Sequence, residues 1–199
     1  MNTSYRTLAR LSEGLYKEKM SKFISFAMPV TTEEEAKAKI DEYRNTYHDA
    51  RHVCWGYRLG AAGELSRSSD NGEPSGTAGK PIIGQCLSNG ITNVLIIVVR
   101  YFGGIKLGTG GLIVAYREAA ADAISNNEII ERAVEKDVTV EFDYLNMDSV
   151  MRLIKDEYVT VKERHFDNRC RMTLSVQLTY ADTLMSALSK IEGVTAEYN

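Results

Sequence analysis

The residues best suited to chemistry gather in the middle of the chain, where ten of the fifteen glycines lie between Gly72 and Gly111. An apolar segment, Val94–Val99, divides these glycines into two clusters, and each cluster runs into a helix-like segment. Glycine permits positive φ angles and close approach of the backbone to a ligand. Two such clusters beside one apolar strand indicate a binding site rather than a linker.

Neither of the standard nucleotide-binding motifs accounts for these glycines. A P-loop requires a glycine where Pro74 stands and a serine or threonine in place of Pro81. The dinucleotide motif G-x-G-x-x-G fails at Ile113, where its third glycine is required. We therefore predict no cofactor.

A more general anion site remains, because the free amides and the dipole at a helix N-terminus favour negative charge. Basic side chains accompany both glycine clusters. The candidate residues for binding an anion or a nucleic acid are Lys80, Arg100, Gly103, Gly104, Lys106, Gly108, Thr109, Gly110 and Gly111. The alternative is that these glycines only allow tight strand-to-helix turns and close packing.

A second candidate set centres on the segment Ser69–Thr77, which carries carboxylates, hydroxyls and a turn-forming Asp-Asn-Gly sequence. A calcium loop needs more acidic positions than this segment has. His48 and His52 are spaced like zinc ligands, but they straddle a predicted helix end and strand start, so no metal site is predicted. The candidate partner-binding or signature residues are His52, Asp70, Gly72, Glu73, Ser75 and Thr77.

Regular elements on both sides of the glycines must position these residues. Val94–Val99 is apolar at every position, which predicts a central strand covered on both faces. The other patterns predict one or two strands over Leu15–Val30, a helix over Thr32–Asn45, strands over Arg51–Leu59 and Glu64–Ser69, and helices over Pro81–Asn89 and Thr109–Asn126.

The last third of the chain has its own order of elements. Strict alternation over Cys170–Leu178 predicts a strand, and helices are predicted over Asn146–Glu157 and Ala181–Glu192. The complete order is β-α-β-β-α-β, which is the ferredoxin-like pattern. The sequence therefore predicts an α+β protein of two α/β sandwich domains, residues 1–130 and 131–199, with the boundary near Asn126–Ala133.

Composition and charge exclude several classes of protein. The chain is 44% hydrophobic and 26% charged, as in ordinary globular proteins. A net charge of −3 excludes a generic polyanion binder, so any contact with nucleic acid must come from a local patch. No apolar run is long enough to span a bilayer, and the first residues lack the apolar core of a signal peptide. We expect a cytoplasmic protein without membrane contact, whose three cysteines are free thiols.

Four segments of the chain match a known pattern: Lys22–Ile24, His48–Cys54, Ser69–Pro81 and Val98–Leu112. In these segments the chain resembles the bacterial, YigZ-like members of the IMPACT family. The resemblance implies an N-terminal α/β sandwich of a type shared with ribosomal-protein and elongation-factor domains. It also implies a C-terminal domain that is similar to the fifth domain of elongation factor G. Asn71 departs from the pattern, because many relatives are expected to carry Asp there.

The resemblance implies a role linked to translation, since eukaryotic members of the family regulate it, and it implies no catalytic residues. The leading hypothesis is a non-enzymatic regulatory or binding protein that contacts RNA, the ribosome or a translation factor through the Gly-rich loops. The sequence does not fix an oligomeric state, and a monomer is compatible with it.

Two alternatives stay open at this point. One is an enzyme that acts on a phosphorylated or nucleotide ligand at the same loops, with Asp70, Glu73 or His52 in acid–base roles. The other is a protein-docking module that uses the C-terminal sheet. A deep pocket joining these three residues with Arg100 would favour the enzyme, whereas a broad basic groove would favour nucleic acid.

Overall fold

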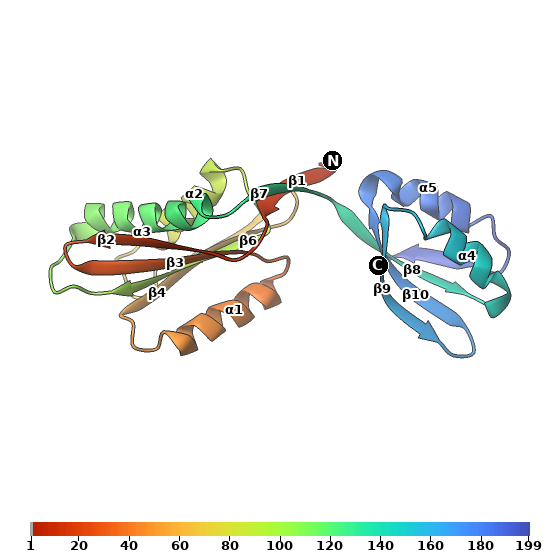
Figure 1. Ribbon diagram of the computed structural model, residues 1–199, viewed down its shortest axis with the longest axis horizontal. Helices are drawn as coiled ribbons and strands as arrows, with labels where there is room; N and C mark the ends of the chain where they lie inside the picture. Colours follow the sequence, from red (N-terminus) through yellow and green to blue (C-terminus); the bar gives the residue numbers. More distant parts are fainter. Residues whose placement is uncertain (1) are drawn as a thin grey trace. The chain divides into compact units, whose positions relative to one another are not determined.

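The computed structural model describes residues 2–199 and divides into two compact units (Figure 1). The N-terminal unit is Ser4–Arg132, and the C-terminal unit is Ala133–Asn199 together with Asn2 and Thr3. The mixture of sheets and helices confirms the predicted α+β class. The predicted boundary between residues 130 and 131, and the likeness to elongation factor G, stay predictions.

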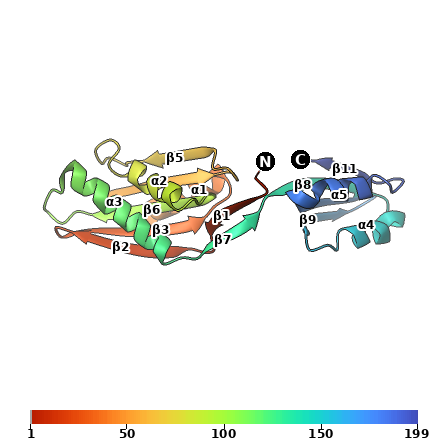
Figure 2. The ribbon, with the colours of Figure 1, turned by 90° about the horizontal axis from the view of Figure 1, so that it is seen from above.

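The N-terminal unit is built on a five-stranded antiparallel sheet with the order β2-β3-β6-β4-β5. Helices α2 and α3 cover one face of this sheet and α1 covers the other (Figures 1 and 2). A separate ladder joins β1 to β7. The elements are β1 (Ser4–Leu8), β2 (Ser12–Glu18), β3 (Ser21–Pro29), α1 (Glu33–Thr46), β4 (His52–Leu59), β5 (Leu65–Ser69), α2 (Gly79–Ser88), β6 (Val94–Tyr101), α3 (Gly108–Ser125) and β7 (Ile129–Ala133).

The middle strand β6 is buried on both faces, as its apolar sequence predicts. Val94, Ile96 and Val98 pack in the cluster under α2 and α3. Leu95, Ile97 and Val99 pack in the cluster under α1. Because β6 is fixed from both sides, the backbone that follows it leaves the sheet at a well-defined position.

The C-terminal unit is a four-stranded antiparallel sheet with the order β11-β8-β10-β9, and its helices pack on one face. This order confirms the predicted ferredoxin-like arrangement. The other face of the sheet is polar. The elements are β8 (Glu135–Phe142), η1 (Tyr144–Asn146), α4 (Met147–Leu153), β9 (Val159–Phe166), β10 (Cys170–Gln177), α5 (Leu178–Leu188) and β11 (Thr195–Tyr198).

Candidate functional site

Arg100 lies near the end of β6, on the face of the sheet that α2 and α3 cover. The strand registers place Phe23 of β3 and His52 of β4 directly beside it. Its guanidinium lies over two aromatic rings, 5.4 Å from the centroid of Phe23 and 5.5 Å from that of Phe102. Arg100 is only 5% exposed. The sequence suggested a basic contact at the surface, but the fold buries this side chain.

Glu73 is the internal partner of Arg100. Nη1 of Arg100 donates to Oε1 of Glu73 at 2.5 Å, and the hydroxyl of Tyr116 donates to the same oxygen at 2.8 Å. Nε2 of His52 lies 3.8 Å from the other carboxylate oxygen. A charge that leaves water is tolerated only when it is paired and hydrogen-bonded, and Glu73 meets both conditions.

Cys54 completes this group, which we call the Glu73 cluster (His52, Cys54, Glu73, Arg100 and Tyr116). Its Sγ lies 3.0 Å from the carbonyl oxygen of Asp70 and 3.4 Å from the hydroxyl of Tyr116. Burial raises the pKa of Cys54 to about 12 and also raises the pKa of Tyr116. The thiol is therefore protonated at neutral pH, which removes the nucleophilic form that covalent catalysis requires.

Asp70 organises the segment Asp70–Ala78, which we call the closed loop. Its carboxylate accepts backbone N–H bonds from Gly76 at 2.8 Å, Ala78 at 3.0 Å and Gly79 at 2.8 Å. Partial burial pushes the pKa of Asp70 upward, but the three N–H bonds outweigh it and lower the pKa below the usual value. This carboxylate fills the N-terminus of α2, the position that an external anion would need.

Other residues of the second candidate set also hold the closed loop together. Nδ1 of His52 is 2.7 Å from the carbonyl oxygen of Asn71, and Oγ1 of Thr77 donates to the carbonyl of Pro74 at 2.6 Å. Only Gly72 and Ser75 of that set are exposed. His52, Asp70, Glu73 and Arg100 do converge, but they bond to one another and to the loop.

The segment Phe102–Leu107, which we call the open loop, has a different character. Phe102 is 47% exposed and Ile105 is 50% exposed, and the side chain of Lys106 is also exposed. Gly104 and Gly108 adopt φ of +89° and +74°, which other residues rarely adopt. At this point the glycines are required by the turn itself.

The open loop leads into a helix whose N-terminus has no internal cap. No side chain caps α3 at Leu107, and Thr109 and Gly110 in its first turn are exposed. First-turn amides of a helix have no partner within the helix. Lys80 is also exposed, but it stands at the helix that Asp70 already caps. The candidate anion set therefore divides into an exposed part at α3 and a buried part at Arg100.

The sequence reasoning missed one contribution to this end of the unit, the turn between β2 and β3. A Cβ atom on Gly103 would collide with the carbonyl carbon of Met20, so the turn and the open loop touch directly. The backbone N–H of Gly103 also donates to Oγ of Ser21 at 3.1 Å. The glycine at position 103 was the available signal, since close backbone approach is one reason for glycine.

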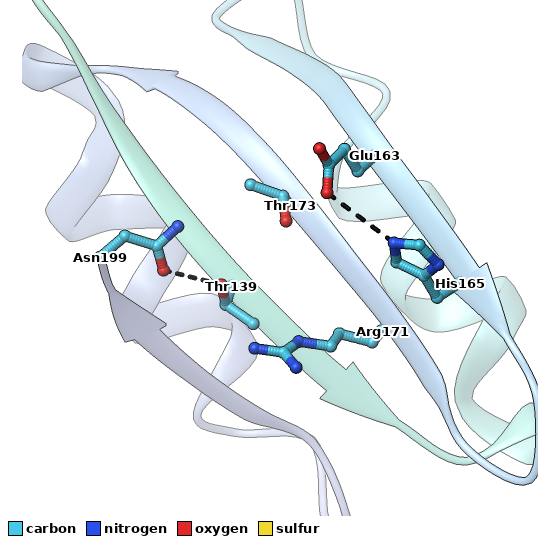
Figure 3. A pocket seen from close by; sticks show the side chains of 6 residues that line it. All are labelled: Thr139, Glu163, His165, Arg171, Thr173 and Asn199. Atoms are coloured by element: carbon cyan, nitrogen blue, oxygen red, sulfur yellow. Dashed lines mark hydrogen bonds and ion pairs between the residues drawn. The ribbon is translucent and has the colours of Figure 1, made fainter.

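A shallow hollow of about 390 Å³ lies on the polar face of the C-terminal sheet (Figure 3). The residues that line it have partners of their own: Thr139 bonds to Asn199 at 2.7 Å, and His165 lies 3.8 Å from Glu163. Arg171 lies 3.5 Å from Glu141, next to the hollow. The hollow presents mixed charges, and its lining includes no Phe, Tyr or Trp, which gives little basis for recognising RNA by stacking.

Within residues 2–199, no three His, Cys, Asp or Glu residues gather so that they could hold a metal ion. Among the helices in that range, none is long and apolar enough to cross a membrane.

Comparisons with known proteins agree on one family. The model of the Impact N-terminal domain matches residues 19–124. The IMPACT family member YvyE of Bacillus subtilis is 30% identical over 174 residues, which cover 87% of this chain and 80% of that protein. The IMPACT family member YigZ of Escherichia coli is 35% identical over 138 residues, 68% of each chain. The crystal structure of a hypothetical protein aligns with a TM-score of 0.79 and 26% identity, covering 98% of this chain and 97% of that one.

Proposed function

This chain belongs to the IMPACT family, and we propose that it is a non-enzymatic, translation-linked binding protein that contacts RNA, free or within the ribosome. The proposed contact residues are those of the open loop and the first turn of α3, with the exposed Lys80 at the start of α2. Such a role would place the protein in the cytoplasm. The C-terminal unit, for which we propose a likeness to the fifth domain of elongation factor G, would support binding without carrying the site.

The observation that carries this proposal is the exposure of the open loop beside an uncapped helix. Lys106 supplies a positive charge, and the first-turn amides of α3 supply donors without an internal acceptor. The chain as a whole has a net charge of −3. A local basic site of this kind is therefore the part of the molecule with which a phosphate would interact favourably.

The geometry gives less support to the alternative of an enzyme. The titratable side chains that converge are those of the Glu73 cluster; His52 is partly buried, the other four are buried, and the cluster is linked by internal hydrogen bonds and ion pairs. An acid or base must reach the proton that it transfers, and a nucleophile must be deprotonated. Cys54, with a pKa of about 12, does not meet the second condition at neutral pH.

The test is recovery of RNA and ribosomes with the tagged full-length protein at low and at high salt. We expect Lys80→Ala with Lys106→Ala to lower recovery at low salt by about tenfold, because contacts with phosphate depend on basic side chains. Arg100→Ala is not a suitable variant, because it would leave Glu73 buried without its partner.

The matched control is Lys155→Ala with Lys190→Ala, which removes two exposed lysines from the C-terminal unit. This control should retain recovery at the wild-type level. If neither RNA nor ribosomes are recovered at low salt, or if both double variants behave alike, the proposed function is wrong.

A further inference from the structure

The turn between β2 and β3 contains an unusual backbone. Glu18 and Ser21 are paired across the two strands, so Lys19 and Met20 alone form the turn. Their φ angles are +44° and +65°, although neither residue is glycine. A two-residue hairpin turn of this geometry strongly favours Asn-Gly. A strained, non-glycine turn at the surface suggests that its side chains have a function.

A second unfavourable feature lies next to this turn. Lys17 and Lys22 are directly opposite each other on β2 and β3. Like charges in directly opposed positions destabilise an antiparallel pair. Glu18 is the acidic residue within the turn region, and Oε2 of Glu18 accepts a long hydrogen bond of 3.4 Å from the hydroxyl of Tyr16. Residues 17–22, which we call the hairpin tip, thus hold three lysines and one glutamate.

The hairpin tip and the open loop form one continuous surface at the same end of the N-terminal unit. Gly103 packs against the backbone of Met20, and Figures 1 and 2 both show the β2–β3 turn beside the segment that leads into α3. Met20 is 82% exposed, and Phe102 and Ile105 are about half exposed. This end of the unit therefore carries exposed apolar side chains together with four exposed lysines, Lys17, Lys19, Lys22 and Lys106. The strand registers place Lys17 and Lys22 on the face of the sheet opposite to Arg100.

We propose that this surface binds single-stranded RNA, with Lys17, Lys19, Lys22 and Lys106 at the phosphates and Phe102 stacked on a base. The inference rests on the proposed function and names its ligand class. Proteins that bind single strands combine a basic track with aromatic side chains on which bases stack. The guanidinium of Arg100 lies over the Phe102 ring, 5.5 Å from its centroid, and Phe102 is 47% exposed. A duplex offers no free base face to such a ring.

The test is fluorescence anisotropy of a short labelled oligouridine with the full-length protein over a series of salt concentrations. The triple variant Lys17→Ser, Lys19→Ser and Lys22→Ser should reduce the slope of log affinity against log salt by about 2, since each lost phosphate contact contributes about 0.7 for a single strand. The charge-matched control is Lys37→Ser, Lys155→Ser and Lys190→Ser, which removes exposed lysines elsewhere. Its slope should equal that of the wild type.

Two further variants separate binding from folding. Lys19→Asn with Met20→Gly gives the turn its favoured sequence, so the midpoint of thermal unfolding should rise while RNA binding weakens. Phe102→Leu keeps an apolar side chain beside Arg100 but removes the stacking surface, and affinity should fall roughly 5- to 100-fold. Phe102→Trp keeps a stacking surface, so its affinity should match that of the wild type.

The failures of this inference and of the proposed function are distinguishable. If the wild type binds oligouridine and Lys106→Ala weakens binding, but the hairpin triple variant matches its control, the inference is wrong and the proposed function stands. Equal affinity for duplex RNA, with no effect of Phe102→Leu, also overturns it. The recovery experiment gives one more outcome. If a co-purifying protein stays bound to the tagged protein after nuclease treatment and is lost only from the hairpin triple variant, this surface binds a protein and the inference is wrong. If the wild type binds no RNA, both proposals fail.

Discussion

The closed loop and the open loop look alike in sequence and differ in structure. Each is rich in glycine, each follows a strand end, and each leads into a helix, α2 or α3. The closed loop carries Asp70 and Glu73, whereas Phe102–Leu107 carries no acidic residue. Asp70 fills the helix N-terminus, and Glu73 neutralises Arg100. The acidic residues of a loop therefore decide whether its anion sites are filled from within or left for a ligand.

The most severe test of this comparison is to remove the charge of Glu73. We expect Glu73→Gln to lower the free energy of unfolding by about 3–5 kcal/mol, because it leaves the buried charge of Arg100 without its partner. Chemical denaturation measures the change. The control is Glu118→Gln, which removes an exposed partner of Arg117 and should cost less than about 0.5 kcal/mol.

A double variant shows whether the pair or the fold around it is responsible. Glu73→Met with Arg100→Met replaces both charges by apolar side chains and should recover much of the stability. If Glu73→Gln costs less than about 1 kcal/mol, the closed loop is not held by this pair, and the contrast between the loops loses its basis.

A smaller effect is expected at Asp70. Asp70→Asn keeps an acceptor but loses the charge at the N-terminus of α2, so stability should fall by about 1–2 kcal/mol. Hydrogen exchange at the amides of Gly76, Ala78 and Gly79 should become faster, since these donate to Asp70.

The sign of the pH dependence follows from the lowered pKa of Asp70. Its contribution is present above the unfolded pKa of about 3.8 and is lost as pH falls through the lower folded value. The free energies of unfolding of the wild type and of Asp70→Asn should therefore differ at neutral pH and converge in strong acid. A constant difference across this range would mean that the charge of Asp70 does not stabilise the loop.

Long apolar patterns were sufficient to predict most of the fold. The run Val94–Val99 identified a strand buried on both faces, because no other environment suits six apolar residues in a strand. The strands β1 and β7 were missed, since five-residue segments such as SYRTL show too little periodicity, and they gain their partners only in the folded chain. Helix α4 is shorter than predicted and ends at Leu153, where tertiary context overrides the apolar stripe.

The start of the helix beside the open loop was predicted from the sequence, whereas the partners of the candidate side chains were not. The glycines of the open loop lie where the sequence indicated, at the start of α3. Arg100 looked like an exposed basic contact, because nothing in the sequence shows that Glu73, 27 positions away, lies against it. Tyr116 was not among the candidate residues, although its hydroxyl bonds to Glu73. Long-range pairing of this kind appears only once the strands are aligned.

The smallest effect on stability is expected in the open loop. Lys106→Ala should change the free energy of unfolding by less than about 0.5 kcal/mol, because the side chain is exposed and takes part in no ion pair among residues 2–199. The same variant should bind RNA more weakly than the wild type, and its slope of log affinity against log salt should be smaller. Loss of binding without loss of stability distinguishes a loop that is open to a ligand from one that is closed on itself. If Lys106→Ala instead destabilises the protein as strongly as Asp70→Asn, the open loop is packed in solution, and both loops serve the fold alone.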